Sequence, residues 1–211
     1  MRNKITAILA SLFLVLSFTS LKAEVNFGVS IIAGQASTSG HELENGSTSD
    51  KNTKEIEEQF VGGSLFMEFV NDNGVAIGID YVPVDVELGD GKRTDTSTGT
   101  GSVGGTRTAS ANLEDLVTLY ASFPLTVGDL YGKVGYHMVD VTTSETLPNA
   151  SYGDDEITGI QIAVGKAYGN VKAEIFYSDF DDVSLTATGG SGSHKIEADA
   201  DALGLKLSFS F

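Results

Sequence analysis

The feature that most constrains this chain is an alternation, with a period of two, of apolar residues with small or polar ones. In the closing stretch LGLKLSFSF, Leu203, Leu205, Leu207, Phe209 and Phe211 occupy every second position. A period of two is typical of β-strands with one apolar face, and no helical period appears beyond residue 23. The alternating segments are 25–31, 61–69, 75–81, 117–123, 130–138, 160–164, 171–177 and 203–211. The sequence therefore predicts an all-β protein of eight strands.

The connections between these segments alternate strictly between long and short. The short ones include Asn71-Asp72-Asn73-Gly74, a sequence typical of tight β-turns. The long polar connections are 37–58, 89–112, 143–156 and 186–199. With an even number of strands, all short turns and both chain ends fall on one side, so an antiparallel up-and-down barrel is expected. Pro83 interrupts the third segment, and we expect a bulge there.

The first residues have the pattern of a secretory signal peptide. Arg2 and Lys4 precede an apolar run from Ile5 to about Phe18, and Ala23 is a small residue at an expected cleavage point. The run is short for a membrane-spanning helix. The sequence thus predicts an exported protein with a signal peptide over residues 1–23 and one domain over residues 24–211.

Charge and cysteine content exclude two classes of protein. The signal peptide carries three basic residues and no acidic one, so residues 24–211 have 10 basic and 29 acidic residues, a formal charge of −19. A chain this acidic is not expected to bind nucleic acid, because phosphate contacts need the opposite sign. The absence of cysteine excludes a scaffold held by disulfides.

Two barrel architectures share the period of two, and they differ in the face that carries the apolar residues. A soluble carrier such as a lipocalin points them inward, whereas an outer-membrane barrel points them at lipid. Here the mixed face is rich in glycine and serine, which suits a narrow interior that leaves room for Phe66, Tyr120 and Phe176. Aromatic residues end the apolar face beside the short turns or the chain end, as in an interfacial belt. They are Phe69, Phe123, Tyr168 and Phe211. We therefore expect a transmembrane β-barrel.

Charged residues on the mixed face are expected to gather inside the barrel near the short turns. They are Glu68, Asp80, Lys133, Glu174 and Lys206. Glu174 and Lys206 lie on neighbouring strands, and because a buried charge without a partner costs several kcal/mol, we expect these two to pair. Such a layer could be an ion pathway or gate, or a plug. Eight strands leave an interior just wide enough for side chains, which favours the plug.

No catalytic, cofactor-binding or metal-binding residue is assigned. His137 also points inward, but no serine or aspartate stands at a recognisable partner spacing, so a hydrogen-bonded histidine is expected rather than a hydrolase site. The long connections are rich in acidic residues. Without a calcium-loop spacing, these acids are interpreted as a solvated anionic surface rather than a selective Ca²⁺ or Mg²⁺ site.

The signal peptide, the eight amphipathic segments, the alternation of long and short connections and the final strand resemble the OmpX/OmpA-type eight-stranded outer-membrane barrels of Gram-negative bacteria. The resemblance implies that Leu207, Phe209 and Phe211 form the signal read by the barrel-assembly machinery. It also implies a monomer in the cell outer membrane, in contact with lipid and lipopolysaccharide. The final strand must pair with the first to remove both sheet edges.

The function expected from this resemblance is structural and surface-facing. Polar loops would serve envelope integrity, adhesion or binding, with the lumen plugged by side chains and no enzymatic activity. Two alternatives remain open from the sequence. One is a small passive pore for ions or small solutes, and the other is a soluble periplasmic lipid carrier.

Overall fold

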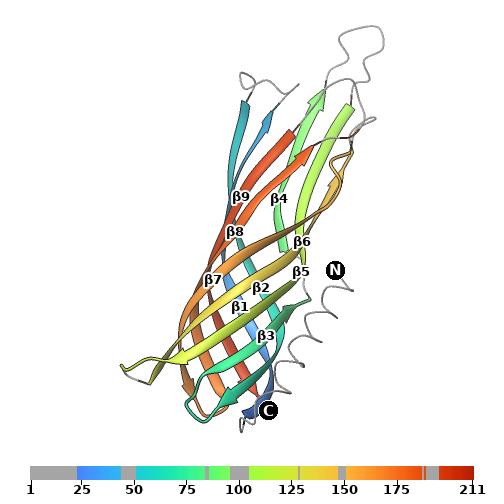
Figure 1. Cartoon of the computed structure of the whole chain (residues 1–211). Coiled ribbons are helices and arrows are strands. Elements are labelled where there is room, and N and C mark those ends of the chain that lie inside the picture. Colours follow the sequence, from blue (N-terminus) through green and yellow to red (C-terminus); the bar gives the residue numbers. More distant parts are fainter. Residues whose placement is uncertain are drawn as a thin grey trace.

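The computed structural model describes residues 23–43, 51–83, 86–95, 105–127, 129–146, 151–186, 188 and 195–211. Residues 1–22 of the predicted signal peptide lie outside the described residues. The chain forms one antiparallel sheet that curls into a barrel (Figure 1). Its strands are β1 (Ala23–Leu43), β2 (Lys51–Asn71), β3 (Ala76–Val82), β4 (Val86–Asp95), β5 (Gly105–Pro124), β6 (Leu130–Glu145), β7 (Asp155–Tyr168), β8 (Val171–Thr186) and β9 (Lys195–Ser210).

The barrel is closed and has eight wall strands, because β3 and β4 are two parts of one interrupted strand. The sheet order is β3-β2-β1-β9-β8-β7-β6-β5-β4, and β3 also pairs with β5. Val82 of β3 pairs with Leu116, and Val86 of β4 pairs with Leu113, on the same partner strand. The predicted eight-stranded antiparallel barrel is confirmed. The interruption lies at Pro83, which lacks a backbone N–H for the ladder.

The apolar face of the strands points outward. On β8, Ile175 is 61% exposed and its cross-strand neighbour Leu205 is 60% exposed, whereas Glu174, Phe176 and Ser178 are buried. An outward apolar face is the arrangement of a membrane barrel, and it is the reverse of a soluble carrier. The predicted orientation is confirmed.

The first and last strands close the barrel. β1 and β9 pair from Gly28↔Ser210 to Leu43↔Lys195. The backbone N–H of Phe211 donates to the carbonyl of Phe27 at 2.9 Å. This pairing removes the two free edges that an open sheet would have.

Short turns and long hairpins lie at opposite ends of the barrel, as Figure 1 shows. In the first short turn the side chain of Asn71 accepts hydrogen bonds from the backbone N–H groups of Asn73 and Val75, at 2.9 and 3.0 Å. Gly74 adopts a φ of 76°, which glycine reaches without strain. The predicted tight turn is confirmed.

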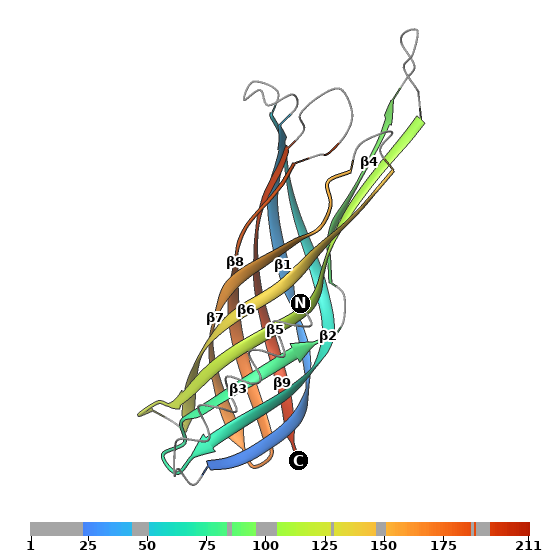
Figure 2. The same cartoon turned by 45° about the vertical axis from the view of Figure 1, so that its right-hand side comes forward.

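The predicted long loops are wrong over much of their length, because the strands continue into them. The β1–β2 ladder extends past Ser37↔Glu57 to Leu43↔Lys51. The β4–β5 ladder likewise includes Asp90↔Ser110, inside the predicted loop 89–112. Above the apolar band the outer face of the strands is no longer apolar, so backbone pairing continues without the regular alternation that the sequence could display. In Figure 2 the wall strands rise well above the closed lower part of the barrel.

Two further irregularities shift the inward-facing positions. The β5–β6 register shifts between Glu114 and Val117, where Asp115 has a φ of 53° and accepts a hydrogen bond from Tyr81. The β8–β9 register shifts between Phe180 and Val183. Each bulge changes which residues of its strand face the lumen.

Candidate functional site: the barrel lumen

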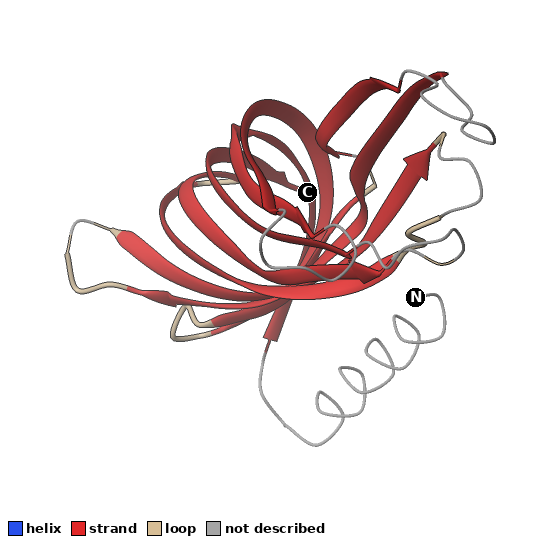
Figure 3. Cartoon of the chain, turned by 90° about the horizontal axis from the view of Figure 1, so that it is seen from above, coloured by secondary structure: helices blue, strands red, loops and turns tan. Residues whose placement is uncertain are grey.

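Figure 3 shows the curled sheet from above. Its inner side carries a charged layer toward the short-turn end. The structure buries all five charged residues predicted to gather there, each at most 8% exposed. They come from β2, β3, β6, β8 and β9, and they are Glu68, Asp80, Lys133, Glu174 and Lys206. With Lys172 of β8, which joins them through Glu68, they are called the ionic layer below.

The ionic layer consists of three ion pairs. Lys133 Nζ lies 3.0 and 3.2 Å from the two carboxylate oxygens of Glu174. Lys206 pairs with Asp80, and Lys172 pairs with Glu68. Three positive and three negative charges are thus balanced within the lumen, which satisfies the requirement that buried charges be paired.

The predicted pairing of Glu174 with Lys206 is wrong. The two residues do stand directly opposite each other on β8 and β9. The Lys206 side chain nevertheless pairs with Asp80 of β3. In the sheet order β3 is separated from β9, the strand of Lys206, by β2 and β1. In a narrow barrel a lysine can reach partners across the axis, so the nearest strand neighbour need not be the partner. Lys172 was missed as a member of the layer, although it shares the sequence parity of Glu174.

Aromatic side chains fill the space around the ionic layer. The hydroxyl of Tyr120 donates to Glu68 at 3.2 Å, and Lys133 Nζ lies 4.7 Å from the centre of the Tyr120 ring. Phe66 occupies the space beside Gly28, where an added Cβ would meet the ring at 2.3 Å. The predicted fit of large rings beside small residues is confirmed. At this level aromatic rings therefore pack among the charged side chains of the lumen.

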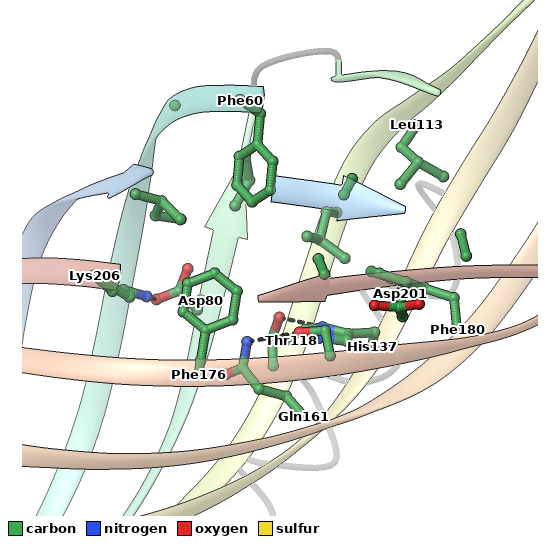
Figure 4. A pocket seen from close by; sticks show the side chains of 18 residues that line it. Phe60, Asp80, Leu113, Thr118, His137, Gln161, Phe176, Phe180, Asp201 and Lys206 are labelled. Carbon is green, nitrogen blue, oxygen red and sulfur yellow. Dashed lines mark hydrogen bonds and ion pairs between the residues drawn. The ribbon is translucent and has the colours of Figure 1, made fainter. Parts of the chain in front are cut away.

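His137 is 1% exposed and lies above the ionic layer. Its Nδ1 lies 2.8 Å from the Thr118 hydroxyl and its Nε2 lies 2.9 Å from the Ser178 hydroxyl, while its ring stacks on Phe180. Figure 4 shows these polar contacts beside Gln161, which donates to Ser178 at 3.2 Å. The prediction of a hydrogen-bonded lumen histidine is confirmed. The sequence did not identify Ser178 as a partner of His137. In a hydrolase site the second ring nitrogen would contact a carboxylate that orients the ring, whereas Nδ1 of His137 contacts the hydroxyl of Thr118.

The upper half of the lumen is apolar, which the sequence analysis did not predict. Its largest fully buried apolar side chains are Val139 and Val141 of β6. The other members of this cluster are Ala36, Leu113, Tyr152, Ile157, Phe180, Val183, Leu185, Ala200 and Ala202. Parity could have placed Val139, Val141 and Ile157 inside, since they continue the inward positions of His137 and Gly159. Leu113 and Val183 lie beyond bulges, where parity fails.

A cavity of about 80 Å³ separates this apolar cluster from the ionic layer. In Figure 4 it is surrounded by Phe60, Leu113, Phe176 and Phe180, and the Lys206–Asp80 pair lies at one end. Asp201 stands beside Phe180 at its edge. We call this cavity the upper chamber.

The residues predicted to face the lipid interface lie at the short-turn end. Phe123, Tyr168 and Phe211 are exposed, and Phe69 is half-buried. Leu207 and Phe209, predicted to belong to the assembly signal with Phe211, also point outward. Their recognition by the assembly machinery stays a prediction.

Beyond the apolar band, a side-chain contact joins β1 to β9. His41 Nε2 lies 2.9 Å from the carboxylate of Glu197, which also pairs with Lys195. Within the ranges described by the structure, no group of three or more histidine or acidic side chains is placed to hold a metal ion. The described residues also contain no helix long and apolar enough to cross a membrane.

We predict a pH response from Glu197. The ammonium of Lys195, through a hydrogen bond and its charge, lowers the pKa of Glu197, and His41 adds a smaller effect. A carboxyl with a lowered folded-state pKa favours the paired strands above its unfolded pKa and loses that contribution as the pH falls through its folded value. Lys195→Gln should raise the pKa of Glu197 in an NMR titration, whereas the distant Lys166→Gln should not. An unchanged pKa in Lys195→Gln would contradict the pairing.

The closed antiparallel wall of eight strands, with its apolar band outside and its charged residues inside, defines the fold of an outer-membrane β-barrel, the OmpX/OmpA architecture. Among solved structures, the chain is similar to the outer membrane protein OprG from Pseudomonas aeruginosa, with 12% identity and a TM-score of 0.45, over 86% of this chain and 96% of that one.

Two further structures show the same low-identity likeness. Neisserial surface protein A is 9% identical, with a TM-score of 0.40, over 86% of this chain and 97% of that one. Ail, the attachment invasion locus protein of Yersinia pestis, is 12% identical, with a TM-score of 0.31, over 86% and 99%. No family model and no curated protein matches the sequence.

Proposed function

We propose that the protein is a monomeric outer-membrane barrel of a Gram-negative bacterium with a structural and surface-facing role and a lumen closed to solutes. The observation that carries this proposal is the ionic layer, whose three ion pairs and the adjacent Tyr120 ring lie across the lumen. Export by the signal peptide, contact with lipopolysaccharide and delivery through the C-terminal strand belong to the same proposal. No catalytic or cofactor-dependent activity is proposed.

The surface role is supported by the strands that extend beyond the apolar band. The β1–β2 ladder there carries polar and acidic residues on both faces, including Glu55, Glu57 and Glu58. Such a surface suits contact with water, with other envelope components or with the surroundings of the cell. The soluble-carrier alternative is disfavoured by the outward exposure of Leu203, Leu205 and Leu207.

Conductance tests the closed lumen. The purified protein in planar bilayers should show no steady current, because the ionic layer occupies the path. In a control variant both Asp80 and Lys206 are replaced by serine. This removes one ion pair of the layer and leaves no unpaired buried charge, so the variant should conduct. Steady current through the unaltered protein, equal to that of the variant, would contradict the closed lumen.

Location and surface role need separate tests. Cell fractionation with heat-modifiable gel mobility should place the folded protein in the outer membrane, and recovery in the osmotic-shock fluid would contradict that location.

A variant that joins Ser37 to Glu57, which are cross-strand partners, through an Asn-Gly turn removes the tip of the first hairpin. If the tip acts in binding, this variant should restore detergent resistance to a deletion strain but not its surface contacts.

A further inference from the structure

A second, smaller cavity lies at the centre of the ionic layer, and we call it the central cavity. Its volume is about 20 Å³, and all six charged side chains of the layer line it. It shares only Asp80 and Lys206 with the upper chamber, so that ion pair lies between the two. The rest of its wall consists of three aromatic residues and two serines, namely Phe66, Tyr120, Tyr131, Ser122 and Ser208.

The size and the charge of the central cavity restrict what can occupy it. A cavity needs about 10–15 Å³ to hold one water molecule. A volume of about 20 Å³ therefore accommodates one water molecule and excludes larger ligands. The three positive and three negative charges around it already form pairs, so an ion would add an uncompensated charge to the interior. The occupant has to be small and neutral.

The hydroxyl of Tyr131 is a polar group of this wall that lacks a protein partner. Its oxygen is buried, and it has no hydrogen-bond partner among the residues that the structure describes. The end of the Tyr131 side chain lies over Gly165, where an added Cβ would stand 2.6 Å from the hydroxyl oxygen. Gly165 is the cross-strand neighbour of Glu174, but Lys133 contacts both oxygens of that carboxylate. A buried hydroxyl without a partner lowers stability, so a partner inside the cavity is expected.

Two serines provide further polar groups at the same cavity. The hydroxyl of Ser30 donates to the hydroxyl of Ser208 at 2.9 Å, so Ser208 keeps its own hydrogen for another acceptor. Ser122, from β5, lines the cavity as well. A buried water typically makes about three hydrogen bonds, within a range of two to four. Tyr131, Ser208 and Ser122 together offer that number.

We propose that the central cavity is a binding site for one water molecule, which forms hydrogen bonds with Tyr131 and Ser208 and completes the polar contacts of the ionic layer. Water in this cavity requires neither a membrane location nor a surface role, so the proposal stands apart from the proposed function. It also does not require that the lumen conduct, which the bilayer recordings test separately.

The bound water is expected to exchange with solvent at the short-turn end of the barrel. A wide cavity of about 780 Å³ lies at that end. It shares Glu68, Ser122, Tyr131 and Lys172 with the central cavity. The Lys172 side chain is 22% exposed, whereas the side chains of the Lys206–Asp80 pair on the opposite side are at most 8% exposed. The Lys172–Glu68 pair is therefore the more accessible of these two boundaries.

Nuclear magnetic resonance tests the site directly, with the full chain refolded in detergent micelles. Phe66 is buried and lines the central cavity, so its ring protons should show a nuclear Overhauser cross-peak at the water frequency. Ser122→Thr keeps the hydroxyl and adds one methyl group at the cavity wall, which should remove the cross-peak. Ser30→Thr makes the same change at a buried lumen residue outside the cavity wall and should leave the cross-peak in place. Heat-modifiable mobility verifies that each variant is folded.

A second measurement asks whether the Tyr131 hydroxyl has a partner. Tyr131→Phe should lower the urea midpoint of unfolding, because the water loses one of its hydrogen bonds. In a dry cavity the same change removes an unpartnered hydroxyl, and the midpoint should stay or rise. Tyr136→Phe, at an exposed outward position of the same strand, is the control and should leave the midpoint unchanged.

Three results would overturn the proposal. One is the absence of a water cross-peak at Phe66 in the unaltered protein. Another is a cross-peak that persists in Ser122→Thr as strongly as in Ser30→Thr. The third is a midpoint of Tyr131→Phe equal to or above that of the unaltered protein.

Discussion

Exchanging the charges of Lys133 and Glu174 should restore most of the stability that reversing either one alone removes. Each side chain is buried, and the lysine contacts both carboxylate oxygens. Breaking a buried pair by removing one partner costs about 3–5 kcal/mol, because the remaining charge is left uncompensated in the interior. Lys133→Glu or Glu174→Lys alone should therefore lower the free energy of unfolding by at least this amount.

The measurement is urea or guanidinium unfolding of the barrel refolded in lipid vesicles, with the two single variants and the exchanged double variant compared in a cycle. The control exchanges Glu174 with Lys206, its cross-strand neighbour, and this should restore nothing, because it breaks the Lys133 pair and the Asp80 pair together. If the control exchange recovered stability and the Lys133 exchange did not, the pairing seen across the lumen would be contradicted.

The second large effect is expected on the outer face. Ile175→Arg should destabilise the folded barrel by about 2–4 kcal/mol, as a cation does at the midplane of a bilayer. Ile175 stands in the middle of the outward apolar positions of β8, between the Gly169 turn and Asp179, and it is strongly exposed. Its side chain meets hydrocarbon if the band spans the membrane.

Val171→Arg is the matched control, on the same face of the same strand but beside the short turn. A cation near the interface costs about 0–1 kcal/mol, because it can reach the headgroups. The same vesicle unfolding assay measures both variants. Equal, small effects at the two positions would mean that Ile175 does not lie in hydrocarbon, and the membrane assignment of the outer face would be wrong.

The alternation of residues along each strand correctly predicted which side chains face outward from the wall and which face the lumen, and for a physical reason. Each strand must present one face to lipid and the other to the axis, so alternation records orientation directly. Glu68 and Lys206 could therefore be placed inside from the sequence alone. Their ion-pair partners could not be predicted, because pairing depends on which side chains reach each other across the lumen. Lys172, the partner of Glu68, lies beside a turn and was not expected in the layer.

Parity failed where the backbone is irregular or where neither face is apolar. The bulges at Asp115 and after Phe180 shift the phase, so Leu113 and Val183 enter the upper cluster without a visible signal. Above the apolar band, residues such as Ser37 and Glu57 pair in a ladder whose side chains both meet water. Backbone hydrogen bonds hold that ladder together, and composition does not record them.

The continuation of β1 and β2 beyond Ser37 and Glu57 has a mechanical consequence. Seven residues of strand span about 20 Å. The end of this hairpin is therefore carried by a paired β-ladder rather than by a flexible segment. A flexible tether loses conformational freedom whenever it is captured, and that loss weakens binding. A paired ladder has already been ordered by folding. Binding at its end therefore loses less conformational entropy, and more of the contact energy appears as affinity.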